Sequence, residues 1–257
     1  MSEVRTPPRR RNRWIVGGGL AVLALTVAAG CLGVVTLLSA ARTYSHFLRA
    51  DAADRTRLTV EATGTSVFLS PGTDSDVRVE AIGSYTGTEP AVAIGADGDT
   101  VAVTAVCRGD CSLRLRVTVP AGLAARVGSG TGAIEARGLG GPLDLRTTTG
   151  TIGVTGSGGP LTLRSGSGSV TVSDSRSSRV SLISGSGGVR ADFAASPHRL
   201  DVVTGDGGVD LTLPKSTDYA VDAHSEGTTT PLISLPVKSS ATHAVRVRTD
   251  NGGIRIH

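Results

Sequence analysis

The chain has 257 residues and a formal net charge of +4, with 35 glycines, 39% hydrophobic residues and only 3% aromatic residues. So few aromatic rings exclude a core of large ring clusters, and the hydrophobic content with a low net charge argues against a disordered chain. Residues 1–13 hold five arginines and one acidic residue, whereas residues 42–257 hold 21 basic and 21 acidic residues. The neutral major part excludes nucleic-acid binding as a leading function.

The segment 14–41 contains no charged residue and is bracketed by Arg13 and Arg42. Because about 20 apolar residues suffice to cross a bilayer, we predict a transmembrane helix over residues 14–41, with the lipid bilayer as its partner. The arginines precede this segment, so the positive-inside rule places residues 1–13 in the cytoplasm as a basic tail. The expected location is the plasma membrane, with one pass and an extracytoplasmic C-terminal domain.

Two alternatives to an uncleaved anchor stay open. Ser39-Ala40-Ala41 could be a signal-peptide cleavage site, although the apolar segment is about twice as long as a signal peptide needs. Ala28-Ala29-Gly30-Cys31 resembles a lipobox, although the residues after Cys31 stay apolar where lipidated proteins turn polar.

Residues 42–56 are predicted to form a charged juxtamembrane connector that extends the helix by a turn or two. From Leu58 onwards the apolar period changes to two, which is typical of half-buried strands. We therefore predict an N-terminal β region over residues 57–125. The alternating stretches are Leu58–Ala62, Val77–Ala81, Val101–Val106 and Leu113–Val119.

One short phrase, a small residue and a glycine followed two positions later by Ile or Val, recurs at nearly constant spacing through residues 126–213. Such a period indicates stacked coils, each too small to bury its own apolar face. We expect two short strands in each coil, and glycine corners with a positive φ, where a Cβ would clash. The shared glycines of the phrase are Gly132, Gly150, Gly168, Gly187 and Gly207.

After Leu213 the spacing changes, although a sixth copy of the phrase stands at residues 251–254. Because a stack of coils needs a distinct end layer, residues 214–257 are predicted to form a C-terminal β cap. The expected fold class is all-β: a β-solenoid-like stack of coils of about 18 to 20 residues with flanking strands, preceded by one transmembrane α-helix.

A strand ending in Val119-Pro120, followed by Thr-Gly-x-Ile coils and preceded by a single apolar segment, resembles the bacterial β-strand-repeat domain called a putative adhesin of unknown function. The resemblance covers roughly residues 58–257 and is strongest from Leu115 to Leu213. It implies a surface-exposed β-solenoid that is commonly membrane-attached, with some relatives linked to envelope-stress sensing. No catalytic residues come with it.

Cys107 and Cys111 enclose the triplet Arg108-Gly109-Asp110. Outside the cell, two cysteines so close on either side of a turn are a reasonable disulfide pair. The triplet resembles an integrin ligand, but a hairpin turn with Gly109 in the left-handed conformation is the favoured explanation. Two cysteines are too few for a structural zinc site.

Other candidates for chemistry are scattered. His198, His224, His243 and His257 stand apart from any nucleophile motif, so we expect no catalytic residues and no cofactor. Asp144, Arg146 and Arg164 could align across adjacent coils, although charges on a solvated face are the ordinary explanation. Acidic turns at Asp74 and Asp76, at Asp97 and Asp99, and near Asp210 suggest calcium but specify no site.

These features favour a membrane-anchored binding, adhesin-like or structural module outside the cytoplasm, whose partner is an unknown envelope polymer, a protein or a second copy of the chain. The alternative is an envelope-stress sensor or regulator that signals through the transmembrane helix. A polysaccharide-active β-helix enzyme is the third hypothesis, and the sequence offers it no catalytic constellation.

Overall fold

The computed structural model describes residues 41–227 and 229–257. The basic tail, the predicted transmembrane segment up to residue 40 and the two alternative processing sites lie outside these residues. Within the described part of the chain, no helix has the length and apolar character required to span a bilayer. Residues Arg42–His257 form one compact unit, and every regular element described in it is a β-strand.

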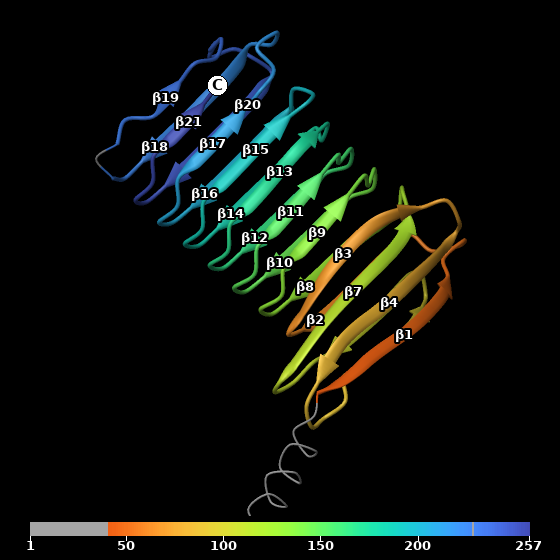
Figure 1. The fold of residues 1–257 in the computed structure, drawn as a ribbon. Coiled ribbons are helices and arrows are strands. Elements are labelled where there is room, and N and C mark those ends of the chain that lie inside the picture. Colours follow the sequence, from red (N-terminus) through yellow and green to blue (C-terminus); the bar gives the residue numbers. More distant parts are fainter. Residues whose placement is uncertain (1–40, 228) are drawn as a thin grey trace, which may run out of the picture. The chain divides into compact units, whose positions relative to one another are not determined.

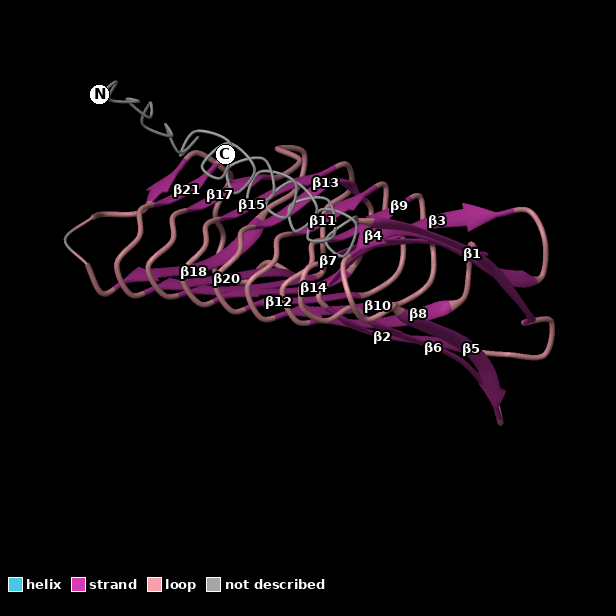
Figure 2. Ribbon diagram, turned by 60° about the horizontal axis from the view of Figure 1, so that its bottom comes forward, coloured by secondary structure: helices cyan, strands magenta, loops and turns pink. Residues whose placement is uncertain are grey.

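The strands of this unit form two sheets, which face each other as separate layers (Figure 2). Sheet A has 11 described strands, in the spatial order β1 (Arg42–Asp51), β4 (Asp76–Tyr85), β7 (Cys111–Pro120), β3 (Thr65–Gly72), β9 (Ile134–Arg137), β11 (Ile152–Thr155), β13 (Val170–Ser175), β15 (Val189–Phe193), β17 (Val209–Thr212), β21 (Ile254–Ile256) and β19 (Leu232–Ile233). Sheet B has 10, in the order β18 (Tyr219–Ser225), β20 (His243–Thr249), β16 (Arg199–Thr204), β14 (Arg179–Ser184), β12 (Leu161–Ser165), β10 (Leu143–Thr147), β8 (Ala124–Ser129), β2 (Arg57–Thr63), β6 (Thr100–Val106) and β5 (Ala91–Asp97).

Each coil gives one strand to each sheet, as the successive layers of Figure 1 show. Strand β10 leads through a corner into β11, and β12 leads in the same way into β13. Neighbouring coils pair in parallel and in register: Leu143 lies beside Leu161 in sheet B, and Ile152 lies beside Val170 in sheet A. The predicted all-β stack of coils with two short strands each is therefore confirmed.

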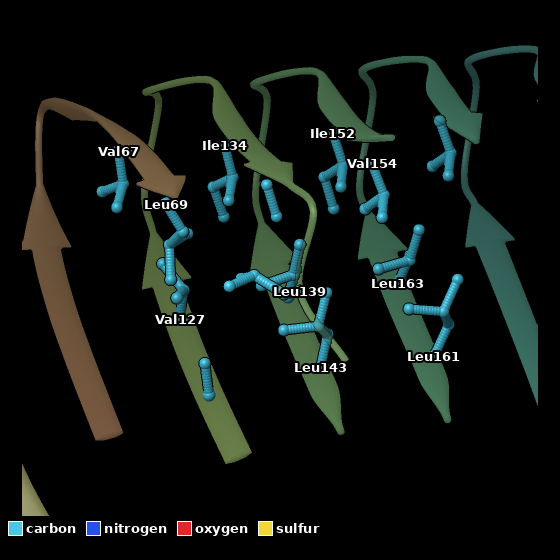
Figure 3. Packing of buried hydrophobic residues seen from close by; sticks show 14 of the residues in the cluster. Val67, Leu69, Val127, Ile134, Leu139, Leu143, Ile152, Val154, Leu161 and Leu163 are labelled. Carbon is cyan, nitrogen blue, oxygen red and sulfur yellow. The ribbon is translucent and has the colours of Figure 1, made fainter. Parts of the chain in front are cut away.

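The register stacks aliphatic side chains into columns between the sheets (Figure 3). Leu145, Leu163 and Leu182 form one column and are fully buried. Because alternate residues of a strand point to opposite faces, the Arg, Asp, Thr and Ser residues between them point outward. Burial of one such leucine stabilises the fold by roughly 1.5–3 kcal/mol, so a core without aromatic clusters suffices.

A second column consists of buried hydroxyl groups at one set of corners. Each hydroxyl donates a hydrogen bond to a backbone carbonyl of the neighbouring layer, at 2.9 to 3.2 Å. In five of the six corners it also accepts a hydrogen bond from the amide of the glycine three residues later. This ladder satisfies backbone groups that the tight corner would otherwise leave unpaired. Its members are Ser129, Thr147, Ser165, Ser184, Thr204 and Thr249.

The corner glycines themselves are needed for a different reason from the one predicted. None of the five has a positive φ. Instead each packs directly on the backbone of the previous layer: a Cβ on Gly150 would lie less than 3.0 Å from the carbonyl of Gly132, and one on Gly168 would meet Gly150 in the same way. The expectation of a left-handed conformation was wrong for these five glycines, whose repeat reflects the close approach of stacked backbones, although Gly138 and Gly156 at other turns of the coils do have a positive φ.

The N-terminal part departs from the regular stack. Residues 42–51, expected to continue a helix within the connector 42–56, form strand β1, which pairs antiparallel with β4. Strands β2 and β3 form the first coil, because they pair in parallel with β8 and β9. Between β3 and β8 the chain makes an excursion, β4 to β7, that lengthens both sheets beyond this first coil.

The C-terminal part reverses the order of its layers. After β17 the chain forms β18 and β19, which are the edge strands of the two sheets. It then returns and inserts β20 and β21 between these edges and the preceding coil. The predicted cap over residues 214–257 thus contains one irregular end layer and one regular coil, in which Gly252 packs on Gly207 like the earlier corner glycines.

Candidate functional site

A groove of about 900 Å³ lies on the outer face of sheet A, across β1, β4, β7, β3 and β9. We call it the arginine groove. The side chains that define it are two phenylalanines and five arginines: Phe47, Phe68, Arg49, Arg78, Arg114, Arg116 and Arg137.

Strand register explains why these side chains meet. Phe47 lies opposite Glu80 on β4, Glu80 lies opposite Arg116 on β7, and Arg116 lies beside Phe68 on β3. Phe68 in turn lies beside Glu135 on β9. Since directly paired residues point to the same face of a sheet, this row runs across five strands on the solvent side. Residues far apart in the chain thereby form one surface.

Most of the arginines in the groove form ion pairs. Arg49 pairs with Asp76 and Arg78 pairs with Asp74. Arg116 lies 3.2 Å from Glu80, and Arg137 lies 3.0 Å from Glu135. The arginine side chains in these pairs are between 50% and 72% exposed, so each pair contributes little to stability.

Arg114 is held differently, because its guanidinium carbon lies 5.4 Å from the centre of the Phe68 ring. This is a cation–π contact. The guanidinium has five N–H donors, and Arg114 forms no ion pair with the residues that the structure describes.

The structure joins Cys107 and Cys111 by a disulfide, with their Cα atoms 5.6 Å apart. The enclosed residues 108–110 are exposed, and Gly109 has a φ of 67°, as the turn interpretation predicts. The backbone amide of Thr86 donates to the carbonyl of Asp110 at 2.9 Å, which fixes this loop against the neighbouring turn.

Asp144, Arg146 and Arg164 lie on the outer face of sheet B, and Arg146 does neighbour Arg164 in the next coil. Arg146 donates two hydrogen bonds of 2.9 Å to Asp144, and these raise the pKa of its guanidinium. The three residues therefore form a solvated surface row, in which Arg146 is paired with Asp144.

Two of the four histidines named above meet: the rings of His198 and His243 stack at 4.7 Å, and His243 Nδ1 lies 2.9 Å from the carbonyl of Pro197. His257 lies near Asp210 instead, and its Nε2 is 3.1 Å from the hydroxyl of Thr212.

The carboxylate of Asp99 accepts hydrogen bonds from Thr56 and Thr100, which lower its pKa. Among residues 41–227 and 229–257, no three His, Cys, Asp or Glu side chains are grouped to hold a metal ion.

The arginine groove was not predicted from the sequence. The alternating pattern did identify Arg78, Arg114 and Arg116 as outward-facing residues of strands. The missing information was strand order, because β4, β7 and β3 are neighbours only through the excursion from the first coil. The hydroxyl ladder, by contrast, had a visible signal, a Ser or Thr three positions before every corner glycine.

The family model described as Toastrack DUF4097 matches residues 109–257, which is more than half of the chain. No curated protein matches the sequence. Among solved structures, a putative cell adhesion protein from Clostridium sporogenes aligns over 84% of this chain and 99% of its own, at 10% identity and a TM-score of 0.43. A putative adhesin from Bacteroides fragilis aligns over 83% and 97%, at 12% identity and a TM-score of 0.42.

Proposed function

Because the chain belongs to the Toastrack DUF4097 family, we propose that it is a non-enzymatic, adhesin-like binding module of the cell envelope. In this proposal residues 14–41 hold it in the plasma membrane, with residues 1–13 in the cytoplasm and the β unit outside. The binding surface is the outer face of the stacked sheets, and the partner is an envelope polymer or protein.

The arginine groove is the observation that carries this proposal. A parallel stack of coils presents flat faces, and most charged residues on them pair with a neighbour. The groove differs, because it is hollowed and combines one exposed and one half-buried aromatic ring with several cations. Aromatic and arginine side chains are the residues that most often dominate binding surfaces.

Cell fractionation and co-sedimentation test the proposal. The full chain should sediment with membranes, and external protease should degrade the β unit in intact cells while sparing the tail. The purified full chain in neutral detergent should also co-sediment with washed cell-wall material. Recovery in the cytosolic fraction, or no retention by the wall material, would contradict the proposal.

The arginine-rich tail favours one second candidate, an envelope sensor that reports through residues 14–41 to a cytoplasmic partner. Removing residues 2–8 keeps Arg9, Arg10, Arg11 and Arg13, which suffice to set topology. A sensor should lose its stress response after this deletion, whereas a pure binding module should be unaffected.

A further inference from the structure

We propose that the arginine groove binds an extended, phosphate-bearing polyanion, such as a phosphodiester polymer of the envelope. This inference rests on the proposed function for where the protein acts, and it names the class of ligand. The contacts follow from three properties of the groove: its arginines, its length across the strands, and its two phenylalanines.

Arginines are concentrated in the groove although the β unit as a whole is neutral. Residues 42–257 contain 21 basic and 21 acidic residues, and five of these basic residues line this one groove. The carboxylates paired with them do not saturate the guanidinium groups, because each guanidinium has five N–H donors and the four paired arginine side chains are at least half exposed. A second anion can therefore bind each arginine from the solvent side, and Arg114 has no carboxylate among its described contacts.

The arrangement of the arginines favours a chain over a single anionic group. Arg78 lies on β4, Arg114 and Arg116 lie on β7, and Arg137 lies on β9. Five adjacent strands, at a spacing of about 4.8 Å, span roughly 19 Å across the groove. One lipid headgroup could reach only some of these cations, whereas a polymer laid across the strands can place successive phosphates against all of them.

The two phenylalanines suit the carbon segments between phosphates. The Phe47 side chain is 75% exposed on the edge strand β1, and Phe68 lies under Arg114 in the middle of the groove. Each ring offers an apolar surface beside a cation, so alternating carbon and phosphate units find matching contacts. Stacking on Phe68 also fixes the guanidinium of Arg114 before the ligand arrives, which reduces the entropy lost on binding.

Binding of long-chain polyphosphate to the purified full chain in neutral detergent tests this inference. The groove variant carries Arg114→Gln and Arg116→Gln. The control variant carries Arg246→Gln and Arg248→Gln, which are also exposed arginines two positions apart on one strand, but on the outer face of sheet B. Both variants lose the same charge, and both keep the basic tail, whose non-specific contribution is therefore the same.

We expect the groove variant to bind polyphosphate at least about tenfold more weakly at moderate salt, with a shallower salt dependence, because it loses two phosphate contacts. The control variant should stay within about twofold of the original chain. Equal losses in both variants would mean non-specific charge attraction, and no loss in either would assign the binding to the tail; either result overturns the inference.

Two further binding measurements distinguish the possible sources of phosphate. Inorganic phosphate should compete only at far higher concentration than the polymer. Vesicles of anionic phospholipid should not discriminate between the two variants; if they do and polyphosphate does not, the groove binds a lipid surface and the inference is wrong. Should the double variant fail to fold, Phe47→Ser, which changes an exposed side chain, must still weaken binding.

Failure of this inference can be distinguished from failure of the proposed function. Retention by cell-wall material with equal binding of both variants to polyphosphate would leave the envelope role standing and remove only this ligand class.

Discussion

The two ends of the β unit hold their strands together in different ways. Residues 42–120 form long strands such as β7, several of them antiparallel, whereas the coils that follow have shorter strands such as β11, and all of these pair in parallel. In the coils, stacked glycines and hydroxyls fix every layer on the one before. Strands β1, β4 and β7 lie beyond the first coil and outside this ladder, and together with β3 and β9 they hold Phe47, Phe68 and the arginines on their outer face. Regular stacking supplies rigidity, and the irregular end supplies the candidate site.

The family match also distinguishes these two regions. It covers residues 109–257, so it includes every coil after the first, whereas the groove strands β1, β3 and β4 lie outside the matched residues.

The most damaging substitution should be one that separates two layers of coils. Gly150→Ala places a Cβ against the backbone of Gly132, which cannot move without shifting the whole layer. We expect a loss of about 3 kcal/mol or more in the free energy of unfolding, or failure to fold. Chemical denaturation of the full chain measures it.

Gly130→Ala is the matched control, because a Cβ there meets no atom within 4 Å. It should be neutral or stabilise by up to about 1 kcal/mol through the unfolded chain. Similar destabilisation by both substitutions would show that the layers are not packed as described.

We expect the disulfide between Cys107 and Cys111 to stabilise the N-terminal region, as the corner glycines stabilise the coils. Replacing Cys107 and Cys111 by alanine removes a loop constraint, which for so short a loop corresponds to about 2 kcal/mol. The thiol count of the denatured full chain decides whether the bond is present: it should be one without reductant, that of Cys31, and three after reduction. Three thiols without reductant would refute the pairing.

Removal of one hydroxyl from the ladder should have a smaller effect. Ser165→Ala leaves the Gly168 amide and the Gly150 carbonyl without their partners at 2.8 and 2.9 Å. Because both groups are buried, we expect a loss of about 1–3 kcal/mol in thermal or denaturant unfolding. Ser167→Ala, which changes an exposed hydroxyl two residues away, should change stability by less than about 0.5 kcal/mol.

The smallest expected effect concerns the turn between β5 and β6. Thr56 and Thr100 donate hydrogen bonds to Asp99 and lower its pKa. A lowered pKa in the folded state stabilises the fold above the unfolded pKa, about 3.9, and this contribution disappears as the pH falls through the folded value.

Thr56→Val removes the largest cause of that shift, so the pKa of Asp99 should rise toward its ordinary value in a carboxyl NMR titration. The substitution Thr88→Val, which removes a hydroxyl that is not hydrogen-bonded to Asp99, should leave the titration unchanged. An unchanged Asp99 in the Thr56 variant would show that the hydrogen bond does not form in solution.

The sequence alone determined the elements of local period: the alternation in Leu113–Val119, the spacing of the corner glycines and the turn at Gly109. These follow from backbone geometry within a single coil. The glycine repeat was visible in the sequence, but its physical reason was not. The close approach of Gly150 to Gly132 exists only between stacked layers. The insertion of β20 and β21 inside the end layer, and the meeting of β1, β4, β7, β3 and β9, were decided by long-range strand pairing. Alternation fixes which face a side chain takes, but not which strand lies beside it, so the arginine groove could emerge only from the tertiary structure.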